Sequence, residues 1–450
     1  MRTITLDARD FLAGESNWDY LGDKGYSPDS YGLNLFLKPG VLNFGWTSQT
    51  TYAPTGNVIG SAYDKNNSGN DVYQMDDEGA FYTLSGSTYT KRQTDTNGGY
   101  ALGTSDIVQF KLVTYATSAS RLVRMTGSDL AALDSTWWVF DGTSGYRHPL
   151  EVVEDALYIG DRNVVYAWDG STSSVACTLP TERQITSLRK HPDGRHLIAF
   201  TGYTNNYSHT NGGPGYIYVI NKDTKTWERE IEIETQVEGS RNVSGVIYVT
   251  YGKKLGYFTG SGVKFLKQLK TSATTYSHCL GNMEDFLIVR DGTNALAYGD
   301  LGNGTKSWHN WYQASQTITN VVYKGNGIML VSDGDGAGGT GNVNQLTYAT
   351  ATGGGRLVSN RYNFGQLVKV RRMEFTYDAK LTGSILNTSL SIRDTDDNTN
   401  LITISYPTGP TPNKSRVELD VTTDIFQFMV LPVNGAFTTK LIRIFYEPID

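Results

Sequence analysis

The residues of this chain best suited to chemistry are its histidines, because imidazole can act as a general base or a metal ligand near neutral pH. There are six, at positions His148, His191, His196, His209, His278 and His309. They show no shared spacing along the chain, and His191 begins a His-Pro-Asp-Gly sequence typical of a plain turn. The sequence therefore predicts loop or core histidines and no metal-binding residues.

Two acidic segments could bind calcium. Asp333-Gly334-Asp335-Gly336 begins like a calcium loop, but Asn344 stands where the late bidentate Glu would fall. Asp394-Thr395-Asp396 is more typical of a hairpin connection between two strands. We expect turns at both places, with calcium at Asp333/Asp335 or Asp394/Asp396 as the alternative.

The motifs of common enzyme classes are missing from the sequence. It contains no Gly-x-Ser-x-Gly elbow, no phosphate-binding Gly-x-x-x-x-Gly-Lys loop and no His-Glu-x-x-His pair. We therefore expect a protein that is not an enzyme, with no catalytic residues and no cofactor.

The elements that must position these residues are strands, which a recurring turn signal indicates. Turn formers follow strand-like runs at a period of roughly 40 to 50 residues, as expected for the blades of a β-propeller. The six signals are Ser85-Gly86-Ser87, Thr126-Gly127-Ser128, Asp169-Gly170-Ser171, Asn221-Lys222-Asp223, Gly260-Ser261-Gly262 and Gly302-Asn303-Gly304.

A further pair of strand-like runs suggests one more blade. Gly327 to Val331 and Gln345 to Tyr348 resemble a seventh repeat, and Val41-Leu42-Asn43-Phe44 is available to close the ring. The sequence thus predicts an all-β propeller of six or seven blades over residues 37–352.

The sequence pattern changes at Gly353, after which apolar and polar residues alternate. Met373, Phe375 and Tyr377 fall on one strand face, and Val417, Leu419 and Val421 fall on another. One apolar face per strand predicts a C-terminal antiparallel β-sandwich over residues 353–450. Residues 1–36 are polar with little periodicity, so we expect an extended N-terminal arm that becomes ordered on a neighbouring subunit.

Composition agrees with strands and turns, since the chain has 49 Gly and 29 Tyr. Candidate helices, Ser128–Leu133 and Pro149–Ala156, are too short to shape the fold. The net charge of -6 argues against a nucleic-acid clamp and is compatible with DNA passing without specific binding. Acidic and apolar residues alternate at Glu230, Ile231, Glu232, Ile233 and Glu234, which indicates that the glutamates form the solvent-exposed face of an edge strand.

Cellular location is indicated by what the chain lacks. Cys177 and Cys279 lie in apolar surroundings and are expected to be two buried thiols. The chain begins without the apolar core of a signal peptide, and no run approaches the length of a membrane helix. A Tyr- and Gly-rich surface without disulfides favours a protein assembled in the host cytoplasm and exposed later, as a virion component is.

The order of parts carries a resemblance to a known class of proteins. An arm beginning Asp7-Ala8-Arg9-Asp10 and a Lys38-Pro39-Gly40-Val41-Leu42 segment precede irregular propeller repeats. A terminal domain opening with Tyr362-Asn363-Phe364-Gly365 and Lys369–Phe375 follows them. This architecture resembles the tail hub or nozzle proteins of tailed bacteriophages. The resemblance implies a structural virion subunit in a ring, six-fold by that likeness, that contacts other tail proteins and inserts into no membrane.

Two alternatives remain at this point. The aromatic segments Trp308–Tyr312 and Tyr203–Tyr207 could stack on sugar rings, as in a host-receptor or glycan-binding tail protein, although Trp308 and Trp311 also suit the seal between blades. A propeller glycosidase is the second alternative, but Gly302 to Trp308 lacks the leading Ser-x-Asp of the sialidase box.

Overall fold

The computed structural model describes most of the chain. The residues described are 1–7, 42–43, 46–63, 72–96, 99–100, 105–127, 130–140, 147–203, 213–270, 280–300, 306–325, 328–334, 341–348, 357–359, 362–377, 386–393, 400–405, 414–434 and 438–449. Every regular element in these ranges is a β-strand. A helix long and apolar enough to cross a membrane is not found in them.

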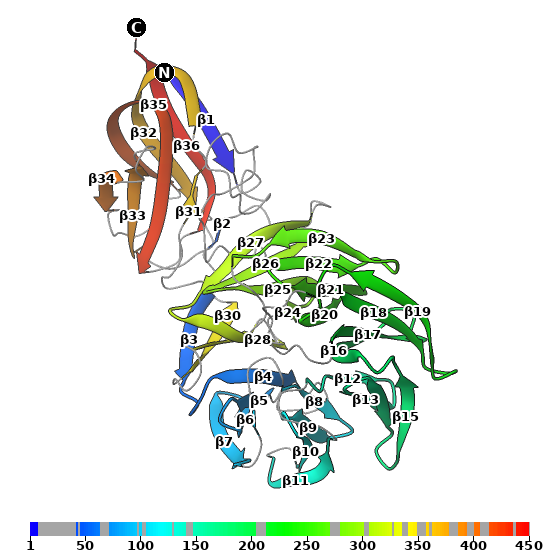
Figure 1. Cartoon of the computed structure of the whole chain (residues 1–450). Helices are drawn as coiled ribbons and strands as arrows, with labels where there is room; N and C mark the ends of the chain where they lie inside the picture. Colours follow the sequence, from blue (N-terminus) through cyan, green and yellow to red (C-terminus); the bar gives the residue numbers. More distant parts are fainter. Residues whose placement is uncertain are drawn as a thin grey trace. The chain divides into compact units, whose positions relative to one another are not determined.

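Seven four-stranded antiparallel sheets form the blades of a propeller (Figure 1). Blade 1 consists of β4 (Val58–Tyr63), β5 (Val72–Asp76), β6 (Ala80–Ser85) and β7 (Thr88–Thr94). Blade 2 consists of β8 (Ile107–Phe110), β9 (Val113–Thr117), β10 (Arg121–Thr126) and β11 (Ala132–Val139). Blade 3 consists of β12 (Leu150–Val153), β13 (Ala156–Asp161), β14 (Val164–Trp168) and β15 (Ser173–Thr178).

The remaining blades follow in chain order. Blade 4 consists of β16 (Arg183–Lys190), β17 (His196–Tyr203), β18 (Gly215–Asn221) and β19 (Thr226–Ile233). Blade 5 consists of β20 (Gly239–Val243), β21 (Val246–Tyr251), β22 (Lys254–Phe258) and β23 (Val263–Gln268). Blade 6 consists of β24 (Leu280–Met283), β25 (Phe286–Asp291), β26 (Asn294–Asp300) and β27 (Lys306–Gln313). Blade 7 consists of β28 (Thr317–Gly325), β29 (Ile328–Gly334), β30 (Asn342–Tyr348) and β3 (Trp46–Tyr52).

The blades close into a ring. Their first strands contact one another in the order β4, β8, β12, β16, β20, β24, β28 and back to β4. Because β3 precedes blade 1 in the chain and supplies the outer strand of blade 7, the ring is closed by N-terminal residues. The prediction of six or seven blades is confirmed, and the number is seven. The suggestion that Val41-Leu42-Asn43-Phe44 closes the ring is wrong, because Leu42–Asn43 pairs with β36 of the C-terminal sheet; the closing strand is β3, which follows it in the chain.

A column of tyrosine rings holds this closure. Tyr52 of β3 stacks on Tyr89 of blade 1 with ring centroids 5.0 Å apart, and Tyr89 stacks on Tyr82 at 4.9 Å. The Tyr52 hydroxyl lies within hydrogen-bond distance of the backbone oxygen of Ser87 in blade 1, at 3.1 Å, and of Oε1 of Gln345 in blade 7, at 3.2 Å. The outer strand of the last blade is thereby fixed to the first blade.

The core lies between neighbouring blades. Blades 1 and 2 share a cluster that includes Phe81 and Val123, both fully buried. Blades 3 and 4 share another that includes Val165 and Leu188. A blade buries its two faces only when it has a neighbour on each side, so ring closure completes the core.

Bulges interrupt the outer strands of blades 1 to 6. In β7, β15, β19, β23 and β27 the pairing with the third strand slips by one residue. The extra residues are Arg92, Ala176, Glu228, Leu266 and Trp311. β11 has a longer irregularity between its partners of Leu122 and Arg124. Bulges disturb the row of free backbone groups that an edge strand offers, and so oppose pairing with other chains.

The C-terminal sheet contains β31 (Leu357–Val358), β32 (Tyr362–Tyr377), β33 (Leu386–Arg393), β34 (Asn400–Ser405), β35 (Lys414–Asn434) and β36 (Thr438–Pro448). The predicted alternation is confirmed at Met373, Phe375, Val417 and Ile442, which are buried in one core. The two separate sheets of the predicted sandwich are not confirmed. Hydrogen bonds connect β1-β36-β32-β35-β33-β34 in one path, because β35 pairs with β32 along its first half and with β33 along its second.

The first residues belong to this sheet, which corrects the expectation of an arm over 1–36. β1 (Arg2–Asp7) pairs with β36, and its Leu6 is buried in the C-terminal core. β2 (Leu42–Asn43) continues along the same edge, since Asp7 lies opposite Leu441 and Leu42 lies opposite Thr439. The physical reason is that Ile4 and Leu6 alternate with polar residues and match the apolar face of β36. The rest of the predicted arm falls in residues 8–41, outside the described ranges.

The candidate helices are also wrong where the structure describes them. Leu150–Val153 forms β12, and Ala132–Val139 forms β11. The chain divides into two compact units. One comprises residues 1–49, 294–313 and 346–450, and the other comprises residues 50–293 and 314–345. This boundary passes through the sheet of blade 6.

Candidate functional site

A pocket of about 650 Å³ lies among the first strands of the blades. Its lining comes from β4, β8, β20, β24 and β28 and from the residues just after β24. Because these strands surround the axis of the ring, we name this cavity the axial pocket. Its polar lining consists mainly of Ser61, Tyr63, Gln109, Arg241, Asn282, Glu284, Asp285, Asn320 and Tyr323.

Hydrogen bonds between blades fix these side chains. Arg241 donates from Nε and Nη2 to Oδ1 of Asn282, at 3.1 and 2.8 Å. Ser61 donates to Oδ1 of Asn320 at 2.6 Å, which connects blade 1 to blade 7. Each pair joins the inner strands of two neighbouring blades, so the pocket wall is held in place before any ligand binds.

The pocket carries charge of both signs. Burial and the nearby guanidinium of Arg189 lower the pKa of Arg241, while Glu151 and Asp106 oppose that shift. The carboxylates in the lining are also hydrogen-bonded: Glu284 accepts a hydrogen bond from the Tyr323 hydroxyl at 3.3 Å, and Asp285 accepts one from Ser244. A pocket lined by a guanidinium, carboxylates and tyrosines suits a small ligand with several hydroxyl groups.

The first acidic segment is built around a buried carboxylate. Asp333 is 1% exposed and accepts hydrogen bonds from the side-chain amides of Asn342 and Asn344. Its pKa is raised by burial and lowered in part by these amides. Asp335, Asp394 and Asp396 lie outside the described residues, so the calcium alternative remains a prediction there.

Asp333 has counterparts in other blades. Asp76, Asp161 and Asp291 also lie at the end of the second strand of a blade, and all three are buried. The Asp76 carboxylate accepts five hydrogen bonds, from Thr55, Gly56, Glu78, Ala80 and Tyr82. In blade 1 this carboxylate organises the turn between the second and third strands, because two of its donors, the backbone N–H groups of Glu78 and Ala80, lie in or next to that turn.

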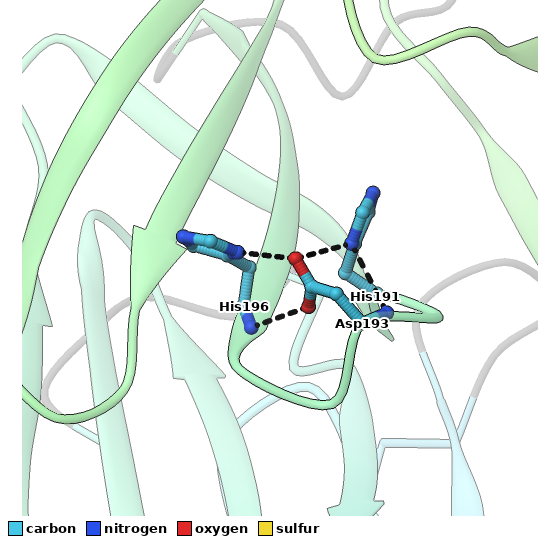
Figure 2. A group of neighbouring side chains, drawn as sticks. All are labelled: His191, Asp193 and His196. Atoms are coloured by element: carbon cyan, nitrogen blue, oxygen red, sulfur yellow. Dashed lines mark hydrogen bonds and ion pairs between the residues drawn. The ribbon is translucent and has the colours of Figure 1, made fainter.

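The histidines divide into two kinds. His148 and His309 are buried, and desolvation lowers the pKa of each to about 4. His148 stacks on Phe140 with ring centroids 3.6 Å apart. His209 and His278 fall outside the described ranges. His191 and His196 flank the predicted turn, which is confirmed, and both contact the Asp193 carboxylate (Figure 2).

The predicted aromatic segment of blade 6 packs inward. Trp311 is 1% exposed, and Trp308 stacks on Tyr298 of the neighbouring strand, with the ring centroids 4.6 Å apart.

The acidic strand and the cysteines are also found as expected where they are described. In β19, Glu230 and Glu232 are exposed on an outer strand. Cys177 is buried, which raises the pKa of its thiol, whereas Cys279 lies outside the described residues.

Sequence reasoning missed the axial pocket and the contact between the two histidines. Arg241 and Asn282 lie within short first strands; Asn282 is the single polar residue of β24, whereas Arg241 stands between the polar residues Ser240 and Asn242 of β20 and gives no such signal. His-x-Asp-x-x-His was visible as a spacing, but the Pro-Asp-Gly turn accounted for it fully. The structure adds that the turn brings both imidazoles to one carboxylate.

Comparisons with known proteins support the fold only. No family model matches the chain, and no curated protein matches it. Among solved structures, a virginiamycin B lyase from Staphylococcus aureus has 10% identity and a TM-score of 0.49, over 67% of this chain and 99% of that one. YCF48 bound to D1 peptide has 10% identity and a TM-score of 0.45, over 68% of this chain and 97% of that one. Raptor from Chaetomium thermophilum has 11% identity and a TM-score of 0.48, over 68% of this chain and 29% of that one.

The expectation that this chain is not an enzyme is corrected by these comparisons. Streptogramin B lyases are among the solved structures that it resembles, so missing sequence motifs do not exclude an activity. At 9 to 10% identity the likeness assigns no reaction to this chain.

Proposed function

We propose that the chain is a structural component of a phage tail, as a hub, nozzle or tail-tip ring subunit that docks other proteins. The observation that carries the proposal is the closed seven-bladed ring with bulged outer strands. Such a ring is rigid and cannot extend through its edges, while its loops are free to vary. The resemblance to tail hub and nozzle proteins supplies the virion context.

The partners in this proposal are copies of the same chain and other tail proteins. Large apolar side chains are exposed on the outer strands of four consecutive blades, 2 to 5: Val139 of β11, Val175 of β15, Trp227 of β19 and Phe265 of β23. The net charge of -6 suits passage of DNA without specific binding. Assembly takes place in the host cytoplasm, before the particle is released.

Residues 8–41 are the segment to test for contacts between subunits. Asp7 and Leu42 lie opposite β36 residues that are two positions apart, so a short Gly-Ser linker can replace 8–41 without disturbing β1 or β2. A Gly-Ser linker of the original length is the matched control. We expect both variants to keep the melting temperature and to lose the ring-shaped oligomers of the natural chain, seen by negative-stain microscopy and light scattering.

A natural chain that stays monomeric at all concentrations, and is absent from purified tails of the phage that encodes it by mass spectrometry, contradicts the proposal. Oligomers that persist in both linker variants contradict the role of residues 8–41. In that case the exposed outer-strand positions are tested next, with V175E and F265E against the polar neighbour variant S174E.

The axial pocket favours a second candidate, a host-receptor or glycan-binding tail protein. Tyr63 and Tyr323 offer rings, and Arg241, Asn282 and Asn320 offer polar groups, which is the lining that saccharides use. A glycan array with the full chain tests it, with Y323A as the pocket variant and Y257A, outside the pocket, as control. Saccharide binding that Y323A weakens supports this candidate, and release of reducing sugar points instead to a glycosidase.

A further inference from the structure

The turn between β16 and β17 places three potential metal ligands together. Nδ1 of His191 and Nδ1 of His196 lie 2.9 and 2.6 Å from Oδ2 of Asp193. All three ligand atoms lie within 4.8 Å of one another. Figure 2 shows the Asp193 carboxylate between the two rings.

The backbone of the turn holds the carboxylate in this orientation. Oδ1 of Asp193 accepts hydrogen bonds from the backbone N–H groups of Arg195 and His196, at 2.9 and 3.0 Å. The turn itself is closed by the bond from the Gly194 N–H to the His191 carbonyl, at 3.0 Å. Oδ2 is thereby left to face the imidazoles, and its position does not depend on side-chain freedom.

A second carboxylate orients one of the rings. Nε2 of His196 lies 3.2 Å from Oε2 of Glu228, and Oε1 of Glu228 accepts a hydrogen bond from Asn221 at 2.6 Å. Glu228 is the extra residue of the bulge in β19, which turns its side chain toward the hairpin. Histidines that bind metals through one nitrogen usually give the other N–H to a carboxylate in this way.

We propose that His191, Asp193 and His196 bind a divalent transition-metal ion of the zinc class, with Glu228 as a positioning residue. Two imidazoles and one carboxylate favour zinc-like ions over calcium or magnesium, which take oxygen ligands. With metal–ligand distances of about 2.0–2.2 Å, tetrahedral ligand atoms lie about 3.3 Å apart. Nδ1 of His191 and Nδ1 of His196, at 2.9 and 2.6 Å from Oδ2 of Asp193, therefore need to move away from that oxygen by less than about 1 Å. The fourth position is left to water or another ligand.

The test is isothermal titration of the full chain with Zn²⁺. We expect one saturable site per chain and at least a tenfold loss of affinity in H191A and in H196A. A variant with two other histidines replaced, H209A/H278A, is the matched control and keeps the affinity. E228Q should weaken binding roughly tenfold while its melting temperature in chelator equals that of the natural chain.

X-ray absorption of the zinc-loaded natural chain tests the ligands without any variant. Two imidazoles and one or two oxygen ligands are expected, and excess Ca²⁺ should not displace the zinc. A spectrum without imidazole, an affinity unchanged in both H191A and H196A, or the lack of saturable binding overturns the proposal. None of these outcomes bears on the phage-tail function, which is tested by assembly.

Discussion

Single buried histidines link the stability of this ring to pH. His148 is 1% exposed, and its pKa is lowered to about 4 in the folded state, so it folds as the neutral form. The unfolded chain takes up a proton near pH 6.5, whereas the folded chain does not until about pH 4. Stability contributed by this group is therefore present above pH 6.5 and is lost as the pH falls toward 4.

We expect H148Q to reduce this acid sensitivity. Between pH 7 and pH 4.5 the natural chain should lose about 2 kcal/mol of unfolding free energy per buried histidine, and H148Q should lose correspondingly less. Urea denaturation at the two pH values measures the difference. His309 has the same shift, so H309Q should behave alike, and equal acid sensitivity in all three proteins contradicts the expectation.

Asp76 tests the role of the repeated carboxylate. Its two oxygens accept five hydrogen bonds, two of them from the hydroxyls of Thr55 and Tyr82. An amide nitrogen cannot accept, so D76N should cost about 2–3 kcal/mol through unpaired buried donors. E78Q removes the same charge from an exposed neighbour and should cost little. Thermal melting measures the stability of the two variants. A loss of stability in D76N alone supports the structural role of Asp76, and equal stability of D76N and E78Q contradicts it.

At this scale the sequence predicted the turns but not the sites. The Pro-Asp-Gly sequence was sufficient to place a turn at Asp193. It could not show that Glu228 approaches His196, because that contact depends on a bulge in a strand 32 residues away. Arg241 and Asn282 meet only through the contact of two blades, which local patterns do not encode.

At the scale of elements, the closing strand β3 depends on an aromatic contact. We expect Y52A to destabilise the ring by about 2–4 kcal/mol, because a ring stacked on Tyr89 is lost. Y52F keeps the stack and loses only the hydroxyl contacts with Ser87 and Gln345, so it should lie near the natural chain. Hydrogen exchange of β3 and β30 measures the change, and similar exchange in Y52A and the natural chain argues against this role.

The strand β3 also explains why the sequence shows six turn signals for seven blades. All six lie between the third and fourth strands of blades 1 to 6. Blade 7 has no such turn, because its third strand β30 and its outer strand β3 are far apart in the chain. The candidate helix over residues 149–156 is wrong because the segment folds back on itself. Leu150–Val153 forms β12, Glu154 and Asp155 form an exposed turn, and Ala156 begins β13, which pairs with β12.

At the scale of the whole chain, the N-terminal residues serve two structures. β1 and β2 pair with β36, whereas β3 completes blade 7. Removal of residues 1–43 should therefore spare the propeller, and removal of residues 1–52 should also open it. We expect the shorter truncation to leave hydrogen exchange in blades 1 and 7 unchanged, and the longer one to increase it strongly. Equal exchange in the two truncations contradicts ring closure by β3.

The fold class was predictable because each blade repeats the same local chemistry. The ends were not, since Leu6 and Leu42 carry no sign of which distant strand they join. The single hydrogen-bonded path of the C-terminal sheet depends on the length of β35, which runs from Lys414 to Asn434 and pairs first with β32 and then with β33. Alternation alone gives the buried face of a strand but not its partners.

Closure by an N-terminal strand also sets an order of events on the ribosome. Thr51 of β3 bonds to Asn344 of β30, which is 293 residues further along the chain. At translation rates of about 5–20 residues per second, the early strand waits roughly 15 to 60 s for its partner to emerge. During that interval the nascent chain has an unpaired strand and an incomplete last blade, so chaperones that bind extended segments have a defined time window in which to act.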